Sequence, residues 1–105
     1  LRKIVRPFLK QPGQGPSQKV MDGGFFKCKF VVTGENGSQK IYSMRGDGDP
    51  GYKVTSKFVC ESALCLLGNH ENLPGGSGYG GILTSSSGLG EVLINRLKNV
   101  GIVFE

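Results

Sequence analysis

The sequence predicts an α+β fold, with a small, mostly antiparallel sheet that contains a β-hairpin and carries two packed helices. The hairpin is indicated at residues 25–45, where strand-like segments lie on both sides of Asn36-Gly37. Two later segments, 54–67 and 89–100, repeat apolar residues at helical spacing. A hairpin followed by helices is typical of the α+β class.

By composition the chain divides into three segments. Residues 1–11 are predicted to end an amphipathic helix, since basic residues separate apolar ones at helical spacing (Leu1, Ile4, Val5, Phe8 and Leu9). Residues 12–24 are a connector rich in proline and glycine, and residues 25–105 are the α+β domain. Because the chain begins at Leu1 and not at Met, we expect a fragment or a processed product of a longer protein.

The hairpin is predicted from a strand at 25–33 and a returning strand at 40–45. Asn36-Gly37 favours a two-residue type I′ turn, which would pair Val32 with Ile41 and Val31 with Tyr42. Both faces of the hairpin then carry apolar side chains. Such a sheet is covered on both sides, or its second face meets another subunit or domain.

After the hairpin, Gly46, Gly48 and Gly51 match the spacing G-x-G-x-x-G of dinucleotide-binding turns. Asp47 and Asp49 would place two carboxylates beside a bound phosphate, and Pro50 would remove one N–H donor. We therefore predict that the segment only turns the chain, with Asp49 as a helix N-cap or turn former. No cofactor-binding residue is predicted in this chain.

A helix is predicted at 54–67, ended by Gly68. Its inner face combines Val54, Phe58 and Cys65 with either Val59 or Ser62. Glu61 interrupts this apolar helix, and it either faces solvent or directs a carboxylate into a substrate pocket.

The rest of the chain supplies a glycine-rich loop at 68–81, a short strand at 82–84, a final helix and a last strand at 102–104. Ser85, Ser86 and Ser87 offer the N-cap of the final helix, and Gly101 offers its C′ position.

Charge and cysteine content narrow the function classes. Four of the 13 Lys and Arg residues lie in the first ten positions, which leaves nine against the eight acidic residues in the rest of the chain. The body therefore lacks a basic stripe, and we do not expect a nucleic-acid partner. Three cysteines without a C-x-x-C pair, together with a single histidine, predict no metal site and favour reduced, mostly buried thiols in an intracellular protein.

The sequence has neither a G-x-S-x-G elbow nor an H-E-x-x-H pair, so no catalytic residue is predicted. The candidates for the wall of a substrate pocket are Asp49, Tyr52 and Glu61, because polar groups that converge on an apolar pocket are the usual pattern of a ligand site.

Several short motifs in order resemble one family. They include Pro12-Gly13-Gln14-Gly15-Pro16-Ser17, Gly48-Asp49-Pro50-Gly51-Tyr52, Glu61-Ser62-Ala63, Gly81-Ile82-Leu83-Thr84 and Leu93-Ile94-Asn95-Arg96-Leu97. From Pro12 onward the chain resembles the C-terminal part of saccharopine dehydrogenase-like oxidoreductases, which also include the trans-acting enoyl reductases of lipid biosynthesis.

This resemblance implies a partner domain and a role. In that family an N-terminal Rossmann domain binds NAD(P), and this chain would be the substrate-binding and dimerisation domain without catalysis of its own. Two alternatives stay open. One is a stand-alone interaction module that dimerises through the hairpin. The other is a lipid-surface or nucleic-acid module that uses the basic N-terminus. The apolar face of the N-terminal helix would then contact a membrane, whereas in a fragment it packs on another part of the parent protein.

Overall fold

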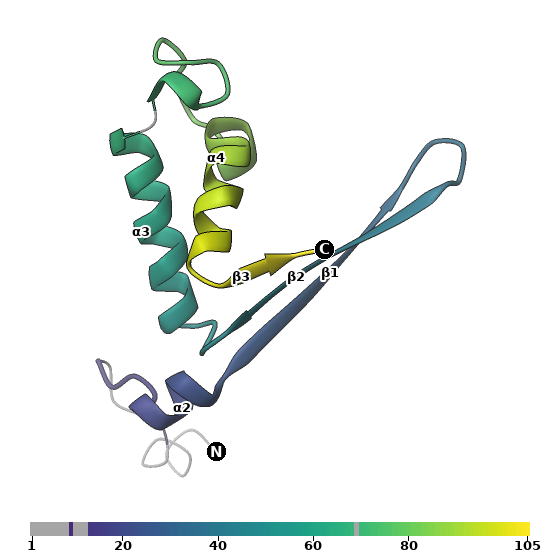
Figure 1. Ribbon diagram of the computed structural model, residues 1–105. Coiled ribbons are helices and arrows are strands. Elements are labelled where there is room, and N and C mark those ends of the chain that lie inside the picture. Colours follow the sequence, from purple (N-terminus) through teal and green to yellow (C-terminus); the bar gives the residue numbers. More distant parts are fainter. Residues whose placement is uncertain (1–8, 10–12, 69) are drawn as a thin grey trace.

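The computed structural model describes residues 9, 13–68 and 70–105, and it confirms the predicted α+β architecture. Three antiparallel strands form a sheet in the order β1-β2-β3, and two longer helices lie side by side next to it (Figure 1). The strands are β1 (Phe25–Thr33), β2 (Gln39–Asp47) and β3 (Ile102–Phe104). The helices are α2 (Gln18–Gly23), α3 (Lys53–Gly68), the 3₁₀ helix η2 (His70–Asn72) and α4 (Ser85–Asn99).

Two local predictions are corrected. Helix α2 lies inside the predicted connector, and its N-cap is Ser17, whose hydroxyl accepts a hydrogen bond from the Val20 amide at 3.4 Å. The short strand predicted at 82–84 is wrong, because Thr84 is the N-cap of α4 and shares a capping box with Ser87. The helix predicted at 1–11 lies, apart from Leu9, outside the described residues.

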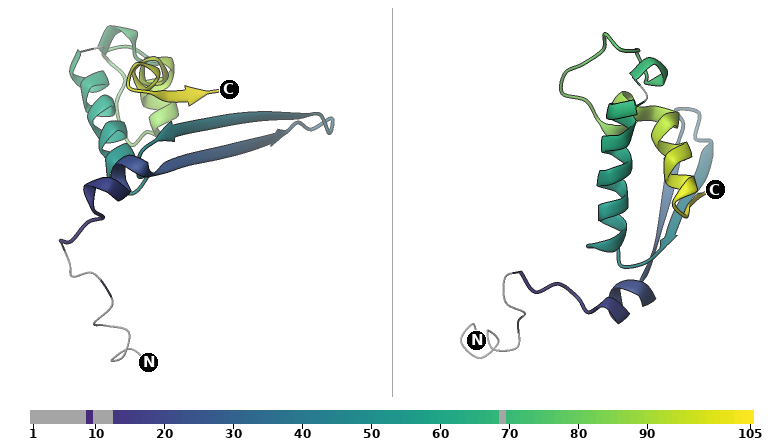
Figure 2. Two further views of the ribbon diagram at one scale, coloured as in Figure 1. Left: turned by 60° about the horizontal axis from the view of Figure 1, so that its bottom comes forward. Right: turned by 60° about the vertical axis from the view of Figure 1, so that its left-hand side comes forward.

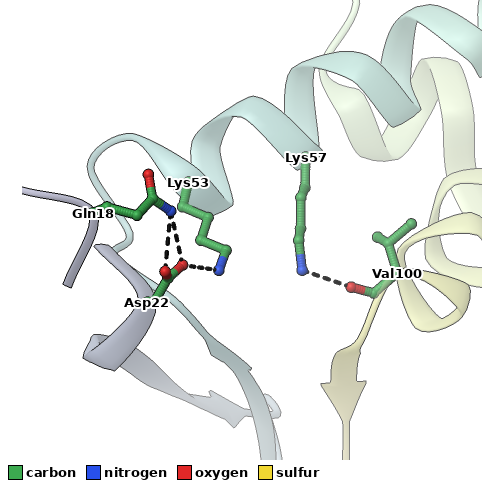
Figure 3. Close-up of polar contacts among 5 residues, drawn as sticks. All are labelled: Gln18, Asp22, Lys53, Lys57 and Val100. Carbon is green, nitrogen blue, oxygen red and sulfur yellow. Dashed lines mark hydrogen bonds and ion pairs between the residues drawn. The ribbon is translucent and has the colours of Figure 1, made fainter. Parts of the chain in front are cut away.

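The core is small and lies between α3, α4 and β3. Its buried hydrophobic residues are Val54, Cys65, Leu89, Leu93, Leu97 and Ile102. Lys57 of α3 donates a hydrogen bond to the carbonyl of Val100 at 2.9 Å (Figure 3). Val100 is the C-cap of α4, and the dipole of a helix favours a cation at its C-terminal end. Of the two inner-face candidates on α3, Ser62 is partly buried, whereas Val59 is 63% exposed.

The hairpin has a different turn from the predicted one. Its loop is Glu35-Asn36-Gly37, since Gly37 N–H donates to the Gly34 carbonyl and Gly34 N–H donates to the Ser38 carbonyl. Gly37 has a φ of 78°, as expected for a type I turn followed by a left-handed residue. The third loop residue shifts the register by one, so that Phe30 pairs with Tyr42 and Val31 with Ile41.

The shifted register decides which side chains share a face of the sheet. The face toward the helices carries Phe26, Phe30, Tyr42, Met44 and Phe104, and the opposite face carries Val31, Ile41 and the charged residues Lys27, Lys29, Arg45 and Glu105. The hairpin extends well beyond the helices, as Figure 2 shows. Only its base pairs with β3, so apolar side chains in its distal half stay exposed on both faces.

The junction between β2 and α3 is fixed by α2. The amide of Gly48 donates to the Gly24 carbonyl at 2.6 Å, and the amide of Asp49 donates to the Met21 carbonyl at 2.8 Å. Asp22 of α2 pairs with Lys53 of α3 and also accepts from Gln18 (Figure 3). Hydrogen bonds from Lys53 and then Gln18 lower the pKa of Asp22.

No described helix combines the length and the apolar character that crossing a membrane requires.

Replacement of Gly24 by alanine is expected to destabilise the fold. A Cβ at this position would lie 2.9 Å from both the Cα and the N of Asp49, and these backbone atoms cannot move aside as a flexible side chain would. We expect Gly24→Ala to lower the free energy of unfolding by about 1–3 kcal/mol in urea titrations. The neighbouring Gly23→Ala is the control, because a Cβ there meets nothing within 4 Å, and equal effects of both substitutions would contradict the close approach.

Candidate functional site

An open apolar groove of about 1020 Å³ separates the inner face of the sheet from the two long helices. The sheet contributes Phe30, Tyr42, Met44 and Phe104 to its lining. The helices contribute Phe58, Val59, Ser62, Ala63, Leu66, Ser85, Ser86, Gly90, Leu93, Ile94 and Leu97. A concave and largely apolar surface of this size can hold a ligand of small-molecule dimensions.

The lining is only partly covered by the chain itself. Phe30 is 50% exposed, Tyr42 is 49% exposed and Leu66 is 54% exposed. Among the polar residues of the groove, the Ser62 hydroxyl donates to the Phe58 carbonyl at 2.7 Å. That hydroxyl is therefore satisfied by its own helix, and the mostly apolar lining suits an apolar group rather than a charged one.

The predicted pocket residues Asp49 and Tyr52 lie together in the turn before α3. The Asp49 carboxylate accepts a hydrogen bond from the Tyr52 amide at 2.7 Å, so Asp49 forms the turn before α3, which is one of the two roles predicted for it. The Tyr52 side chain is 55% exposed. Neither residue lines the groove, and their contact with a substrate stays a prediction.

The third candidate, Glu61, lies on α3 away from this turn. Its carboxylate accepts a hydrogen bond from the Nε of Arg96 on α4 at 2.7 Å, and its side chain is 14% exposed. Glu61 therefore joins the two helices as an ion pair and is not among the residues of the groove. The structure does not bring the three candidates together.

The cysteines do not form a reactive cluster. Only Cys65 is buried, Cys28 is partly buried and Cys60 is exposed, which corrects the expectation that most of the thiols are buried. Burial raises the pKa of the Cys65 thiol, an effect that the nearby Arg96 opposes and Glu61 reinforces. In the ranges 13–68 and 70–105, together with residue 9, no three His, Cys, Asp or Glu residues gather as metal ligands would.

The sequence did not indicate the groove, for a physical reason. Its walls come from residues that are far apart along the chain, such as Phe30, Val59 and Ile94. Helical and strand periodicity marks such residues as apolar but does not distinguish a buried face from an open one. The available signal was that α3 is apolar around more of its circumference than one packed face requires.

Comparison with known proteins gives relatives of one kind. A Mycobacterium tuberculosis protein, provisionally named as a trans-acting enoyl reductase, is 33% identical over 101 residues. The trans-acting enoyl reductase of Mycobacterium ulcerans is 31% identical over 102 residues, and that of Mycobacterium bovis is 28% identical over 102 residues.

The aligned region is nearly all of this chain but a small part of each relative. It covers 96–97% of this chain but only 23% of each of these relatives. It extends further than the stretch from Pro12 that the sequence motifs marked. No protein-family model matches the chain. No solved structure matches it significantly.

Loss of the Glu61 charge is expected to destabilise the packing of α3 against α4. Glu61→Gln leaves Arg96 without its carboxylate in a partly buried setting, so the free energy of unfolding should fall by about 1–2 kcal/mol in thermal or urea denaturation. Glu91→Gln on the exposed side of α4 is the control and should change stability by less than about 0.5 kcal/mol. A Glu61 variant as stable as this control would show that the ion pair contributes nothing.

Proposed function

We propose that this chain is the substrate-binding and dimerisation part of a saccharopine dehydrogenase-like, NAD(P)-dependent enoyl reductase, and that it does not catalyse the reaction alone. The observation that carries the proposal is the apolar groove between the sheet, α3 and α4. The similarity to proteins named trans-acting enoyl reductases supplies the reaction class.

The groove suits the hydrocarbon part of an enoyl substrate. Each buried methylene of such a chain contributes about 0.8 kcal/mol, so an elongated apolar tail gains affinity with its length. Side chains such as Phe30, Leu66 and Ile94 would surround the tail. Their partial exposure leaves room for a ligand that displaces water from the groove.

The nicotinamide cofactor belongs, in this proposal, to an N-terminal Rossmann domain outside the chain. The turn at 46–51 supports this division, because the amides of Gly48, Asp49 and Tyr52 already donate to groups within the chain. A phosphate would need these donors to converge on it. Three free cysteines favour a reducing, intracellular compartment.

The test is binding of a long-chain trans-2-enoyl thioester of N-acetylcysteamine to the chain, measured by titration calorimetry. Val59→Asp places a carboxylate on the groove wall and should weaken binding about tenfold or more. Leu67→Asp is the matched control, since Leu67 is on the same helix, is 78% exposed and does not line the groove.

Chain length of the ligand provides the second comparison. A short-chain enoyl thioester should bind much more weakly than the long-chain one, because it buries fewer methylenes. The proposal for the groove would be refuted if the affinity changed with neither chain length nor Val59→Asp, or if the long-chain thioester did not bind.

Dimerisation through the hairpin is a second candidate function, favoured by the exposed distal half of β1 and β2. Val31 and Ile41 pair on the outer face and are 59% and 65% exposed. A two-stranded hairpin that packs on nothing is marginally stable in water, so a second copy would stabilise it.

Light scattering across a dilution series should therefore show a dimer that dissociates at low concentration. Ile41→Ser should raise the protein concentration at which half of the dimer dissociates, because it removes apolar area from the hairpin. Ile82→Ser, in a loop and fully exposed, should leave this concentration unchanged. A monomer at every concentration would eliminate this candidate.

A further inference from the structure

Three cations lie together on the outer face of the sheet, away from the groove. Lys27 and Lys29 are two residues apart on β1, and Arg45 is directly opposite Lys27 on β2. Lys27 and Lys29 are exposed, and the Arg45 side chain is 53% exposed. We call these three residues the outer cation cluster.

The register of the hairpin creates this cluster. With the two-residue turn that Asn36-Gly37 suggested, Arg45 would pair with Cys28 and lie on the face of the groove. The observed three-residue loop moves Arg45 to the outer face beside Lys27. The cluster is therefore absent from the linear sequence, where the two segments are far apart.

The cluster is incompletely neutralised by the chain. Glu105 lies 3.8 Å from the Nε of Arg45, and its other carboxylate oxygen accepts a hydrogen bond from the Ser43 hydroxyl at 2.9 Å. Within the part of the chain that the structure describes, no ion pair involves Lys27 or Lys29. Like charges that face each other across strands destabilise a sheet, so the Lys27–Arg45 pair opposes folding in the isolated chain.

Protection of a sheet edge explains only part of this arrangement. Lysines on an edge strand prevent unwanted strand pairing, and β1 is an edge strand. Arg45, however, is on the central strand β2, where it has no edge to protect. A binding role accounts for all three cations, because an anionic partner would remove the repulsion among them.

We propose that the outer cation cluster is a docking surface for an acidic protein. Charge complementarity identifies the partner, and the apolar side chains at both ends of the cluster argue for a protein rather than a nucleic acid. Phe25 is 74% exposed at one end, and Val31 and Ile41 are exposed at the other. Asp47, paired with Phe25, and Glu105 would repel a continuous phosphate backbone. This surface is distinct from the groove and does not depend on the function proposed for the groove. It shares Val31 and Ile41 with the hairpin surface considered for dimerisation, whereas Lys27, Lys29 and Arg45 belong to the docking surface alone.

The probe is a short fluorescent peptide with a central block of glutamates and leucines at both ends, compared with a peptide that has glutamines in place of the glutamates. Fluorescence anisotropy at low salt should show binding of the glutamate peptide alone, because screening is weak under these conditions. Lys27→Gln combined with Lys29→Gln should weaken this binding roughly fivefold, as expected when two exposed ion pairs are lost.

Lys19→Gln combined with Lys98→Gln is the control, since it removes the same charge from exposed positions on α2 and α4. This pair should change the affinity less than twofold, and equal losses from both pairs would mean that only net charge matters, which refutes the docking surface. Single-stranded DNA and phosphatidylserine vesicles are titrated in parallel. If either of them, rather than the glutamate peptide, responds selectively to the Lys27 and Lys29 substitutions, the proposed protein partner is wrong.

Discussion

The three-residue loop of the hairpin is the constraint on which both surfaces of the sheet depend. Side chains alternate along a strand, so a shift of one residue in pairing exchanges every contact across the two strands. Gly37 accepts the left-handed conformation that this loop requires. The resulting register places Tyr42 and Met44 beside Phe30 and Cys28 on the face toward the groove, and Arg45 beside Lys27 on the outer face.

The sequence predicts most of the helices and strands, but it does not predict how the two strands of the hairpin pair. Alternation and helical spacing are local signals, and they located β1, α3, α4 and β3 closely. Asn36-Gly37 is compatible with two loops that differ by one residue, and the local sequence does not choose between them. The sequence pattern does not predict helix α2, because six residues give little periodicity, although Ser17 at its N-cap is a helix-start signal.

The candidate site was harder to predict for a different reason. Polar residues that flank apolar ones are typical of ligand sites, and this pattern predicts Asp49, Tyr52 and Glu61 as pocket residues. Two of them are satisfied locally: Asp49 by a hydrogen bond within its turn, and Glu61 by an ion pair with Arg96. The groove instead arises from apolar residues that β1, α3 and α4 bring together, and such a surface exists only once the tertiary contacts are known.

The fold is extended, and this shape leaves apolar surface exposed. The radius of gyration is 18.1 Å, whereas a compact chain of this length would have about 13 Å. Among the described residues, six buried hydrophobic side chains form the core, and the projecting hairpin contributes none of them. The relatives are more than four times as long as the matched stretch, since it covers 23% of their length. An open groove and an uncovered hairpin are the surfaces that a substrate, a second copy or further polypeptide would cover, and burying them would supply the apolar contacts that the chain does not make within itself.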